Sequence, residues 1–205
     1  ACNASLQANQ QLPDGLWEQA TAALETVETA TEKRFGDPQK PLLVSSRSGA
    51  KFSMPGMMDT VLNLGLNDEV AQGMAQREDN AHFIYDCYRR LVQMFGSVVL
   101  GVPDEDFEDT LCNYKLNHAR ATDADLTAED WQQVTRIFQS RVQQYARAPF
   151  PQDAHTQLRQ SIEAVFKSWH GRRARHYRRA AGIADDLRTA VSIVTMVFGN
   201  HDANS

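Results

Sequence analysis

Residues 44–68 read VSSRSGAKFSMPGMMDTVLNLGLND, and their composition differs from that of the helical sequence on either side. Within 45–60 there are two glycines, one proline, three methionines and two basic residues. A short β-prone run at 41–46 leads directly into Arg47, so we expect this arginine to be presented from a rigid strand edge. Its planar guanidinium suits bidentate contact with phosphate.

The second half of the stretch adds groups that can approach a ligand. Pro55-Gly56 is a turn signal, and glycine lets the backbone come close to a bound molecule. Asp59-Thr60 predicts the start of a short helical run over 61–66, whose first N–H groups would form an anion site with the Thr60 hydroxyl. The alternative is a surface loop in which Arg47 neutralises a carboxylate. Three methionines suit either packing against an adenine ring or filling of the core: Met54, Met57 and Met58.

The composition is that of a globular protein of one domain, or of one domain with a subdomain. The chain has 205 residues, 42% hydrophobic and 23% charged, which is long enough to bury a sizeable core. A formal net charge of −5 argues against nucleic acid or an anionic membrane as a partner. No apolar run approaches the roughly 20 residues of a membrane span, and neither the P-loop nor the dinucleotide glycine fingerprint occurs.

The cysteines and the chain ends indicate, less specifically, the compartment and the extent of the protein. Cys2, Cys87 and Cys112 form an odd set without CxxC spacing, which favours a reducing cytoplasm over a disulfide framework. The first ten residues lack the basic start and apolar stretch of a signal peptide. Because the sequence starts without methionine and stops soon after an apolar run, we expect a piece of a longer protein.

Apolar residues recur at helical spacing over most of the chain, which predicts a mostly helical protein. The predicted helices carry their apolar stripes at 17–27, 84–98, 107–111, 131–142 and 158–169. Asp14 is the predicted N-cap of the first helix, Pro103 opens the third, and Thr127 with Asp130 predicts a capping box at the fourth.

Two apolar, β-prone runs predict strands. One is 41–46, and the other is AVSIVTMVFG at 190–199, which we expect to be buried. They lie about 145 residues apart with helices between them. The predicted class is α+β and predominantly helical, with a small β-sheet that bears a large helical insertion.

Four passages, in chain order, match one known family: VSSRSGAKFSMPGMMDTVLNLGLND (44–68), FIYDCYRRLVQMF (83–95), AVFKSWHGRRARHYRR (164–179) and AVSIVTMVFGN (190–200). They closely resemble the N-terminal nucleotide-binding domain of the pyruvate phosphate dikinase family. Phosphoenolpyruvate synthase and rifampin phosphotransferase carry a looser version of the first passage. The resemblance spans nearly the whole chain, and the long helical insertion favours the dikinase family over these relatives.

The resemblance implies part of an ATP-grasp-like nucleotide-binding domain over residues 1–205. Region 41–66 would hold the nucleotide loop, 67–188 the helical insertion, and 189–200 a strand that returns to the sheet. Enzymes of this family phosphorylate a histidine on a separate, swivelling domain, and they convert ATP, phosphate and pyruvate to AMP, pyrophosphate and phosphoenolpyruvate. The implied cofactors are Mg²⁺ with ATP and a monovalent cation, and the implied full-length assembly is a homo-oligomer.

The resemblance also assigns candidate ATP-binding residues. Arg47 would contact the ATP phosphates, Gly56 and Met58 would line the nucleotide, and Thr60 would lie near the phosphates. Arg90 would face the nucleotide cleft or the docked histidine domain. The phosphohistidine and the acidic metal ligands are expected outside this chain. No catalytic residue and no metal ligand is therefore assigned within it, and we expect the chain alone to be inactive.

Departures from the family and a basic run leave other interpretations open. Val194 stands where the family usually has glutamine, which removes one side-chain contact to nucleotide. Six of the 21 basic residues fall within 167–179, so Arg172, Arg173 and Arg175 either dock an acidic surface of the histidine domain or form a solvated helix face. Arg90 follows Asp86 by four residues, which alternatively predicts a helical ion pair. A non-catalytic helical docking module is the alternative function.

Overall fold

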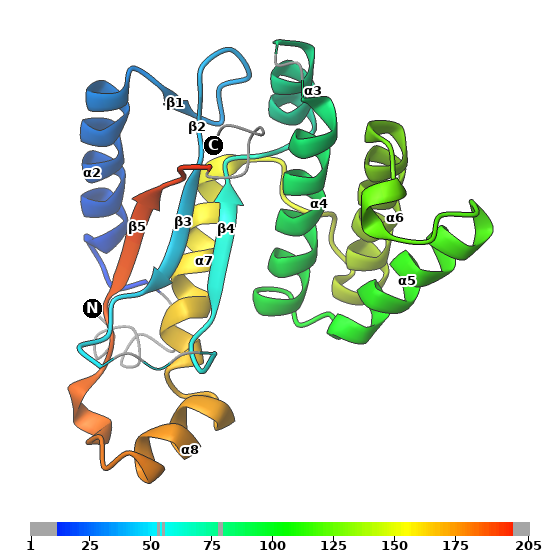
Figure 1. Ribbon diagram of the computed structural model, residues 1–205. Helices are drawn as coiled ribbons and strands as arrows, with labels where there is room; N and C mark the ends of the chain where they lie inside the picture. The colour runs from blue at the N-terminus through cyan, green and yellow to red at the C-terminus, as the bar shows by residue number, and fades with distance from the viewer. Residues whose placement is uncertain (1–11, 53, 55, 78–79, 199–205) are drawn as a thin grey trace.

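The computed structural model describes residues 12–52, 54, 56–77 and 80–198, which form seven α-helices and five short strands (Figure 1). In chain order they are α2 (Leu16–Thr31), β1 (Arg34–Phe35), β2 (Pro41–Leu42), β3 (Val44–Ser48), β4 (Thr60–Leu64), α3 (Asp68–Arg77), α4 (Ala81–Val98), α5 (Asp104–Asn117), α6 (Ala128–Ala146), α7 (Ala154–Ser168), α8 (Arg172–Ala180) and β5 (Val191–Thr195). Two 3₁₀ turns, η1 (Asp123–Asp125) and η2 (Asp185–Leu187), complete the set. The predicted class, α+β and predominantly helical, is confirmed.

β3 is the central strand of a three-stranded antiparallel sheet, with β4 on one side and β5 on the other. Its pairing with β5 runs from Val44 opposite Thr195 to Ser48 opposite Val191. The two predicted strands, far apart in sequence, therefore lie side by side in one small sheet. β1 and β2 form a separate parallel pair.

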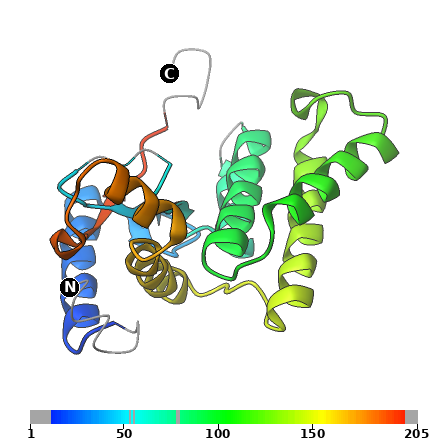
Figure 2. The same cartoon turned by 90° about the horizontal axis from the view of Figure 1, so that it is seen from below.

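α7 covers one face of this sheet, while α2 and α4 lie beyond its β5 and β4 edges (Figure 1). α7 packs against all three strands, while α4 packs against β4 and also against α3 and α6. α2 lies along the β5 side of the molecule. Figure 2 shows from below that α8, at the end of the sheet, lies beside the connection between β3 and β4.

The predicted apolar stripes form the core. On α6, Trp131, Val134, Phe138 and Val142 are all buried, because the 3.6-residue period places them on one face. Each such side chain stabilises the fold by roughly 1.5–3 kcal/mol when it is fully buried. The predicted capping box is also confirmed, since the N–H of Asp130 donates to Thr127 Oγ1 at 3.2 Å and the Asp130 carboxylate accepts the N–H of Thr127 at 2.9 Å.

The prediction of a helix over 61–66 is wrong. Residues 61–64 belong to β4. Because no helix starts there, the anion site predicted at its N-terminus is absent as well. A short apolar run does not distinguish strand from helix by itself, so pairing with β3 decides. Asn63, with φ 61°, and Gly65, with φ 104°, also depart from helical backbone angles.

Two smaller predictions are also wrong. α2 begins after Gly15, which has the left-handed φ of 77°, so Asp14 is not its N-cap. β5 is not a buried strand, because its residues alternate between half-buried and exposed, and Val194 is 46% exposed. The alternation is typical of a strand with one face packed and one face open. Position 199 of the predicted strand lies outside the described residues.

Candidate functional site

Arg47 and Thr60, two of the predicted ATP-binding residues, are cross-strand neighbours. The register of β3 and β4 places them directly opposite each other, and Ser192 of β5 lies opposite Arg47 on its other side. Directly opposed side chains share one face of a sheet, with Cβ atoms about 4.5–5.5 Å apart. Arg47 is exposed, and within the described part of the chain it forms no ion pair. Its guanidinium is therefore available to a ligand.

Position 194, where the family usually has glutamine, lies on the same face as Arg47. Residues of β5 alternate between the faces of the sheet, and Val191, Ile193 and Thr195 line an apolar cleft of about 380 Å³ between α2 and α7. Val194 therefore points to the opposite face, and its exposed apolar side chain borders the face that carries Arg47.

Gly56 and Met58 lie in the connection between β3 and β4, hereafter the loop 49–59. Gly56 has φ 71°, a backbone angle that side chains rarely adopt, and a Cβ there would meet nothing within 4 Å. Glycine is thus favoured at position 56 by the backbone angle and not by a lack of space for a side chain. Met58 is half-buried, with Sδ 3.8 Å from the hydroxyl of Ser168, and Met54 is buried in the core. Of the two uses that the sequence leaves open for the methionines, Met54 serves core packing.

Asp59 fastens the last part of the loop to the end of α7 and the start of α8. Its N–H donates to Ser168 Oγ at 3.4 Å, and Arg173 Nη2 donates to its carboxylate at 3.0 Å. Burial raises the pKa of Asp59, and the Arg173 guanidinium opposes this shift. Sequence reasoning did not identify Asp59 or Ser168 as anchors. The available signal was that both lie inside the passages that resemble the family.

The first part of the loop is fastened to the residues that precede β5. Ser48 Oγ and Thr189 Oγ1 are hydrogen-bonded at 2.8 Å, and the N–H of Gly49 donates to the Ala190 carbonyl at 2.8 Å. A Cβ on Gly49 would lie 2.9 Å from Ser192 Oγ, so a larger residue would have to displace that side chain. The loop is thus held at both ends while Arg47 stays open.

Arg90 forms the predicted ion pair with Asp86, at 2.8 Å across one helical turn of α4. Its side chain is 59% exposed, and among the described residues it forms no hydrogen bond or ion pair with the loop 49–59. Its neighbour Arg89 is buried, bonds to the same Asp86, and lies over the ring of Trp131 at 4.8 Å. The two arginines therefore differ in role, and Arg89 belongs to the core.

The basic run 167–179 is not a uniform surface. Arg172 and Arg175 are exposed on α8, whereas Arg173 is engaged with Asp59. Arg178 is 1% exposed and donates to the Trp169 carbonyl at 2.7 Å. The interpretation of this whole run as a solvated helix face is therefore wrong for Arg178.

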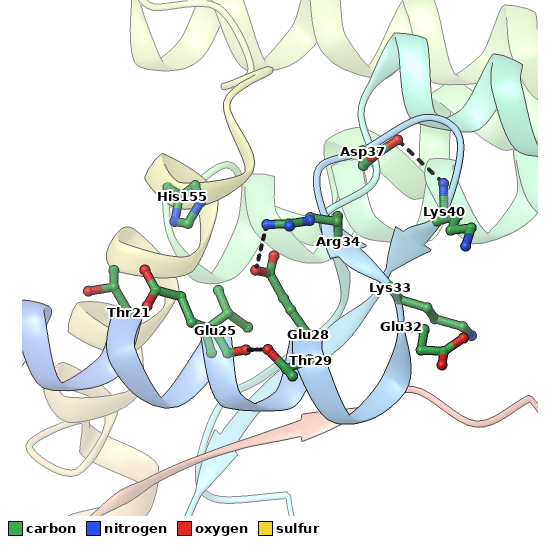
Figure 3. Close-up of a pocket in the computed structure, with 11 residues that line it drawn as sticks. Thr21, Glu25, Glu28, Thr29, Glu32, Lys33, Arg34, Asp37, Lys40 and His155 are labelled. Atoms are coloured by element: carbon green, nitrogen blue, oxygen red, sulfur yellow. Dashed lines mark hydrogen bonds and ion pairs between the residues drawn. The ribbon is translucent and has the colours of Figure 1, made fainter.

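A polar cavity of about 730 Å³ lies between α2, the β1–β2 connection and His155 (Figure 3). None of the predicted site residues lines it. The Glu28 carboxylate accepts the N–H of Phe35 at 2.7 Å and lies 3.9 Å from Arg34. Asp37 likewise accepts the N–H groups of Gln39 and Lys40. These carboxylates hold the β1–β2 connection in place.

The described residues contain no group of three or more His, Cys, Asp or Glu side chains that could hold a metal ion. Near the loop, the Asp59 carboxylate is already paired with Arg173. The described residues therefore do not fit a dedicated Mg²⁺ site. No helix in the described part of the chain has the length and apolar character needed to cross a membrane.

Comparison with known proteins identifies the family. Residues 5–204 match the family model of the pyruvate phosphate dikinase AMP/ATP-binding domain. The chain is 44% identical to a pyruvate, phosphate dikinase of Rhizobium meliloti over 98% of its length, 47% identical to one of Giardia intestinalis over 92%, and 46% identical to pyruvate, phosphate dikinase 1, chloroplastic, of Oryza sativa over 98%. It spans 22%, 21% and 21% of these relatives, respectively, which is about a fifth of their length.

Proposed function

Because this chain belongs to the family of the pyruvate phosphate dikinase AMP/ATP-binding domain, we propose that it forms the ATP-handling part of a phosphotransferase. In this proposal, the whole protein phosphorylates a histidine on a separate domain. It thereby interconverts ATP, phosphate and pyruvate with AMP, pyrophosphate and phosphoenolpyruvate. The observation that supports the site most directly is the cross-strand pair of Arg47 and Thr60 beside a loop fastened at both ends.

The proposed roles follow from this geometry. Arg47 binds phosphate oxygens through a bidentate, charge-assisted contact, and Thr60 adds a hydroxyl from the facing position. Gly56 holds a turn that brings backbone groups to the nucleotide, and Met58 packs beside it. Because the loop is anchored at Ser48 and Asp59, little ordering would be needed when ATP binds.

Mg²⁺ enters this proposal as part of the substrate, bound to the ATP phosphates. Mg²⁺ is commonly held by substrate phosphates with one or two carboxylates, and the carboxylates are proposed to come from elsewhere in the protein. A monovalent cation is proposed in the same way. Arg90 is proposed to face the nucleotide cleft or the docked domain, where it would have to exchange its contact with Asp86 for the ligand.

The domain division, assembly and compartment are also proposals. We propose 41–66 as the nucleotide loop region of an ATP-grasp-like domain, 67–188 as a helical insertion and 189–200 as the returning strand. Within the insertion, α7 packs on the sheet, α4 packs against β4, and α3, α5 and α6 pack against α4. A cytoplasmic location is proposed from the odd number of cysteines and their lack of CxxC spacing. A homo-oligomer and pyruvate binding elsewhere are proposed from the family.

Docking of the histidine domain is proposed at the start of α8. Exposed charges steer encounter and register without a large buried area. Arg172 and Arg175 are the better test of this role than Arg173, because a change at Arg173 would also break its contact with Asp59. Replacing Arg172 and Arg175 together by glutamate should slow histidine phosphorylation and reduce its salt dependence, with ATP affinity unchanged.

Two alternatives remain. A phosphoenolpyruvate synthase-like phosphotransferase would use the same loop but would not require inorganic phosphate. A non-catalytic helical docking module would keep the loop without binding nucleotide. The exposed Arg47 forms no ion pair among the described residues, which favours the enzyme, because a structural arginine would be expected to pair within the fold.

The decisive experiment is the change Arg47→Gln in the full-length protein that contains this chain. We expect histidine phosphorylation by Mg²⁺–ATP to fall by at least 10²-fold, because one charge-assisted contact to developing charge is worth several kcal/mol. Lys51→Gln, at an exposed cation of the same loop, is the matched control and should stay near the wild-type rate. Equal rates for Arg47→Gln and wild type would refute the proposed site.

A further inference from the structure

One edge of the three-stranded sheet is open among the described residues. β5 pairs with β3 on one side, and no described strand lies on its other side. At the two ends of this pairing, the N–H of Gly49 donates to the Ala190 carbonyl at 2.8 Å, and the N–H of Met196 donates to the Leu43 carbonyl at 2.9 Å. Bonded and non-bonded positions alternate in an antiparallel ladder, so the even-numbered residues of β5 bond to β3.

The peptide groups of the odd-numbered residues therefore point away from β3. These residues are Val191, Ile193 and Thr195, and outside the sheet no described residue forms a backbone hydrogen bond with them. A sheet edge with unpaired N–H and C=O groups is a template for a further strand, and native proteins usually cover or charge such edges. No residue of β5 is charged. The edge thus favours an extended segment as its partner.

The side chains of the same three residues line the apolar cleft of about 380 Å³ between α2 and α7. Gln19 and Thr195 are the polar residues of its lining, and the others are apolar. The open edge and the cleft are therefore parts of one surface. A strand paired with β5 would present every second side chain to the face of the sheet that borders the cleft.

The apolar stripe of α2 is covered only in part on the side of this cleft. Within α2, all of whose residues are described, only Leu24 is buried, and three other apolar residues that line the cleft are half-buried: Leu16, Ala20 and Val27. Most of the stability of a helix in a protein comes from the packing of its apolar face. Since α2 lies beyond the β5 edge (Figure 1), a segment added at this edge would complete its packing.

We propose that an extended segment of the full-length protein, from outside these 205 residues, pairs with β5 as the next strand of the sheet and fills the cleft. The three outward peptide groups specify an extended backbone, because a strand can pair with all of them. Because every second side chain would enter the cleft, the segment should be apolar at alternate positions. Its other side chains would extend the face of the sheet that carries Arg47.

The length of the relatives favours a segment of the same protein over a separate partner. The chain spans about a fifth of their length, so most of the polypeptide that could supply a strand lies outside it. Covalent linkage gives such a segment a high effective concentration at the edge. A second copy is disfavoured, because pairing of two β5 edges would bring the two α2 helices into the same space. The proposal needs a longer protein but no nucleotide binding at Arg47.

The test is amide hydrogen exchange in the full-length protein without nucleotide, resolved to single residues by mass spectrometry. If the edge is paired, the N–H groups of Val191, Ile193 and Thr195 should exchange within about tenfold of the rates of Ser192 and Val194, which bond to β3. If the edge is open, the odd-numbered N–H groups should exchange about 10²-fold faster or more. That alternation would overturn the proposal.

Val27→Asp in the full-length protein tests the cleft, because it places a charge where the added strand would bury it. We expect exchange at the odd-numbered positions of β5 to rise about tenfold or more relative to Ser192 and Val194. Thr26→Asp, at the exposed neighbouring position, is the matched control and should leave exchange unchanged. Equal exchange in the two variants would contradict filling of the cleft.

Dilution of the wild-type protein separates the proposed occupant from a second copy. Protection by a segment of the same chain should not depend on protein concentration, whereas protection that is lost on dilution would assign the edge to a second copy and overturn the proposal. If Val27→Asp does not fold, the wild-type comparison of odd- and even-numbered positions still decides. Because no nucleotide is present, the result is separate from that of Arg47→Gln.

Discussion

The guanidinium carbon of Arg178 lies 4.2 Å from the centre of the Trp169 ring, and its Nη1 donates to the carbonyl of the same tryptophan. One side chain thus binds both the ring and the backbone at the end of α7. Since Arg178 is almost fully buried, it joins α8 to the rest of the fold. A basic residue in an apparently solvated run is here a core residue.

Replacing Arg178 by methionine should therefore destabilise the protein by about 2–3 kcal/mol. Methionine keeps much of the length, but the Trp169 carbonyl loses its donor and the cation–π contact disappears. Urea unfolding followed by circular dichroism gives the free energy of unfolding. Arg179→Met, at the exposed neighbouring position, should change it by no more than about 0.5 kcal/mol. Equal midpoints for the two variants would contradict the assigned role.

The sequence predicts the helices of this fold better than its small sheet. The stripe on α6 extends over several turns, so its period identifies both the helix and its buried face. β4 has only five residues, and pairing with β3 decides its conformation. Likewise, Arg47 and Thr60 are recognisable as candidates one by one, but their direct opposition depends on strand register. The contact between Asp59 and Arg173 joins residues 114 positions apart, which no local pattern reveals.

The Asp59–Arg173 contact should couple the loop to α8 weakly. The Arg173 side chain is 69% exposed, so we expect a coupling free energy of about 0.2–1 kcal/mol in a double-mutant cycle with Asp59→Asn and Arg173→Gln. Because solvent and salt screen this pair, the coupling should fall towards zero at about 1 M sodium chloride. A coupling that is unchanged at high salt would mean that the pair is not the electrostatic anchor of the loop.

The N-cap of α7 should contribute stability that acid removes. Asp153 accepts the N–H of Thr156 at 2.6 Å, and hydrogen bonding from Thr156 holds the pKa of this carboxyl below its usual value. The unfolded chain then binds the proton more readily than the folded one. This contribution is therefore complete above the unfolded pKa, about 3.9, and is lost as pH falls through the lower folded value.

Asp153→Ala should accordingly lower the free energy of unfolding by about 1 kcal/mol at pH 7. Near pH 2–3 the difference from wild type should be smaller. Urea titrations at a series of pH values measure this difference. Asp14→Ala is the control, because Asp14 is exposed and does not occupy the N-cap of α2. A cost at Asp14 as large as that at Asp153 would show that the two aspartates are not distinguished by capping.

Arg188→Gly should raise the free energy of unfolding by about 1–2 kcal/mol. Glycine adopts φ 59° and ψ 179° without the side-chain clash that arginine suffers there. Relief of such strain stabilises the fold by about 1–3 kcal/mol, and the lost packing of the arginine side chain reduces this gain. Arg188→Gln keeps the strain, so it should not show this gain. The measurement is urea unfolding followed by circular dichroism.

Arg147→Gly is the matched control. Arg147, at the end of α6, also has a positive φ, but its φ of 54° and ψ of 25° lie in the ordinary left-handed region. Non-glycine residues tolerate that region better, so the gain at Arg147 should be smaller than the gain at Arg188. An equal or smaller gain than at Arg147 would show that Arg188 stores no special strain.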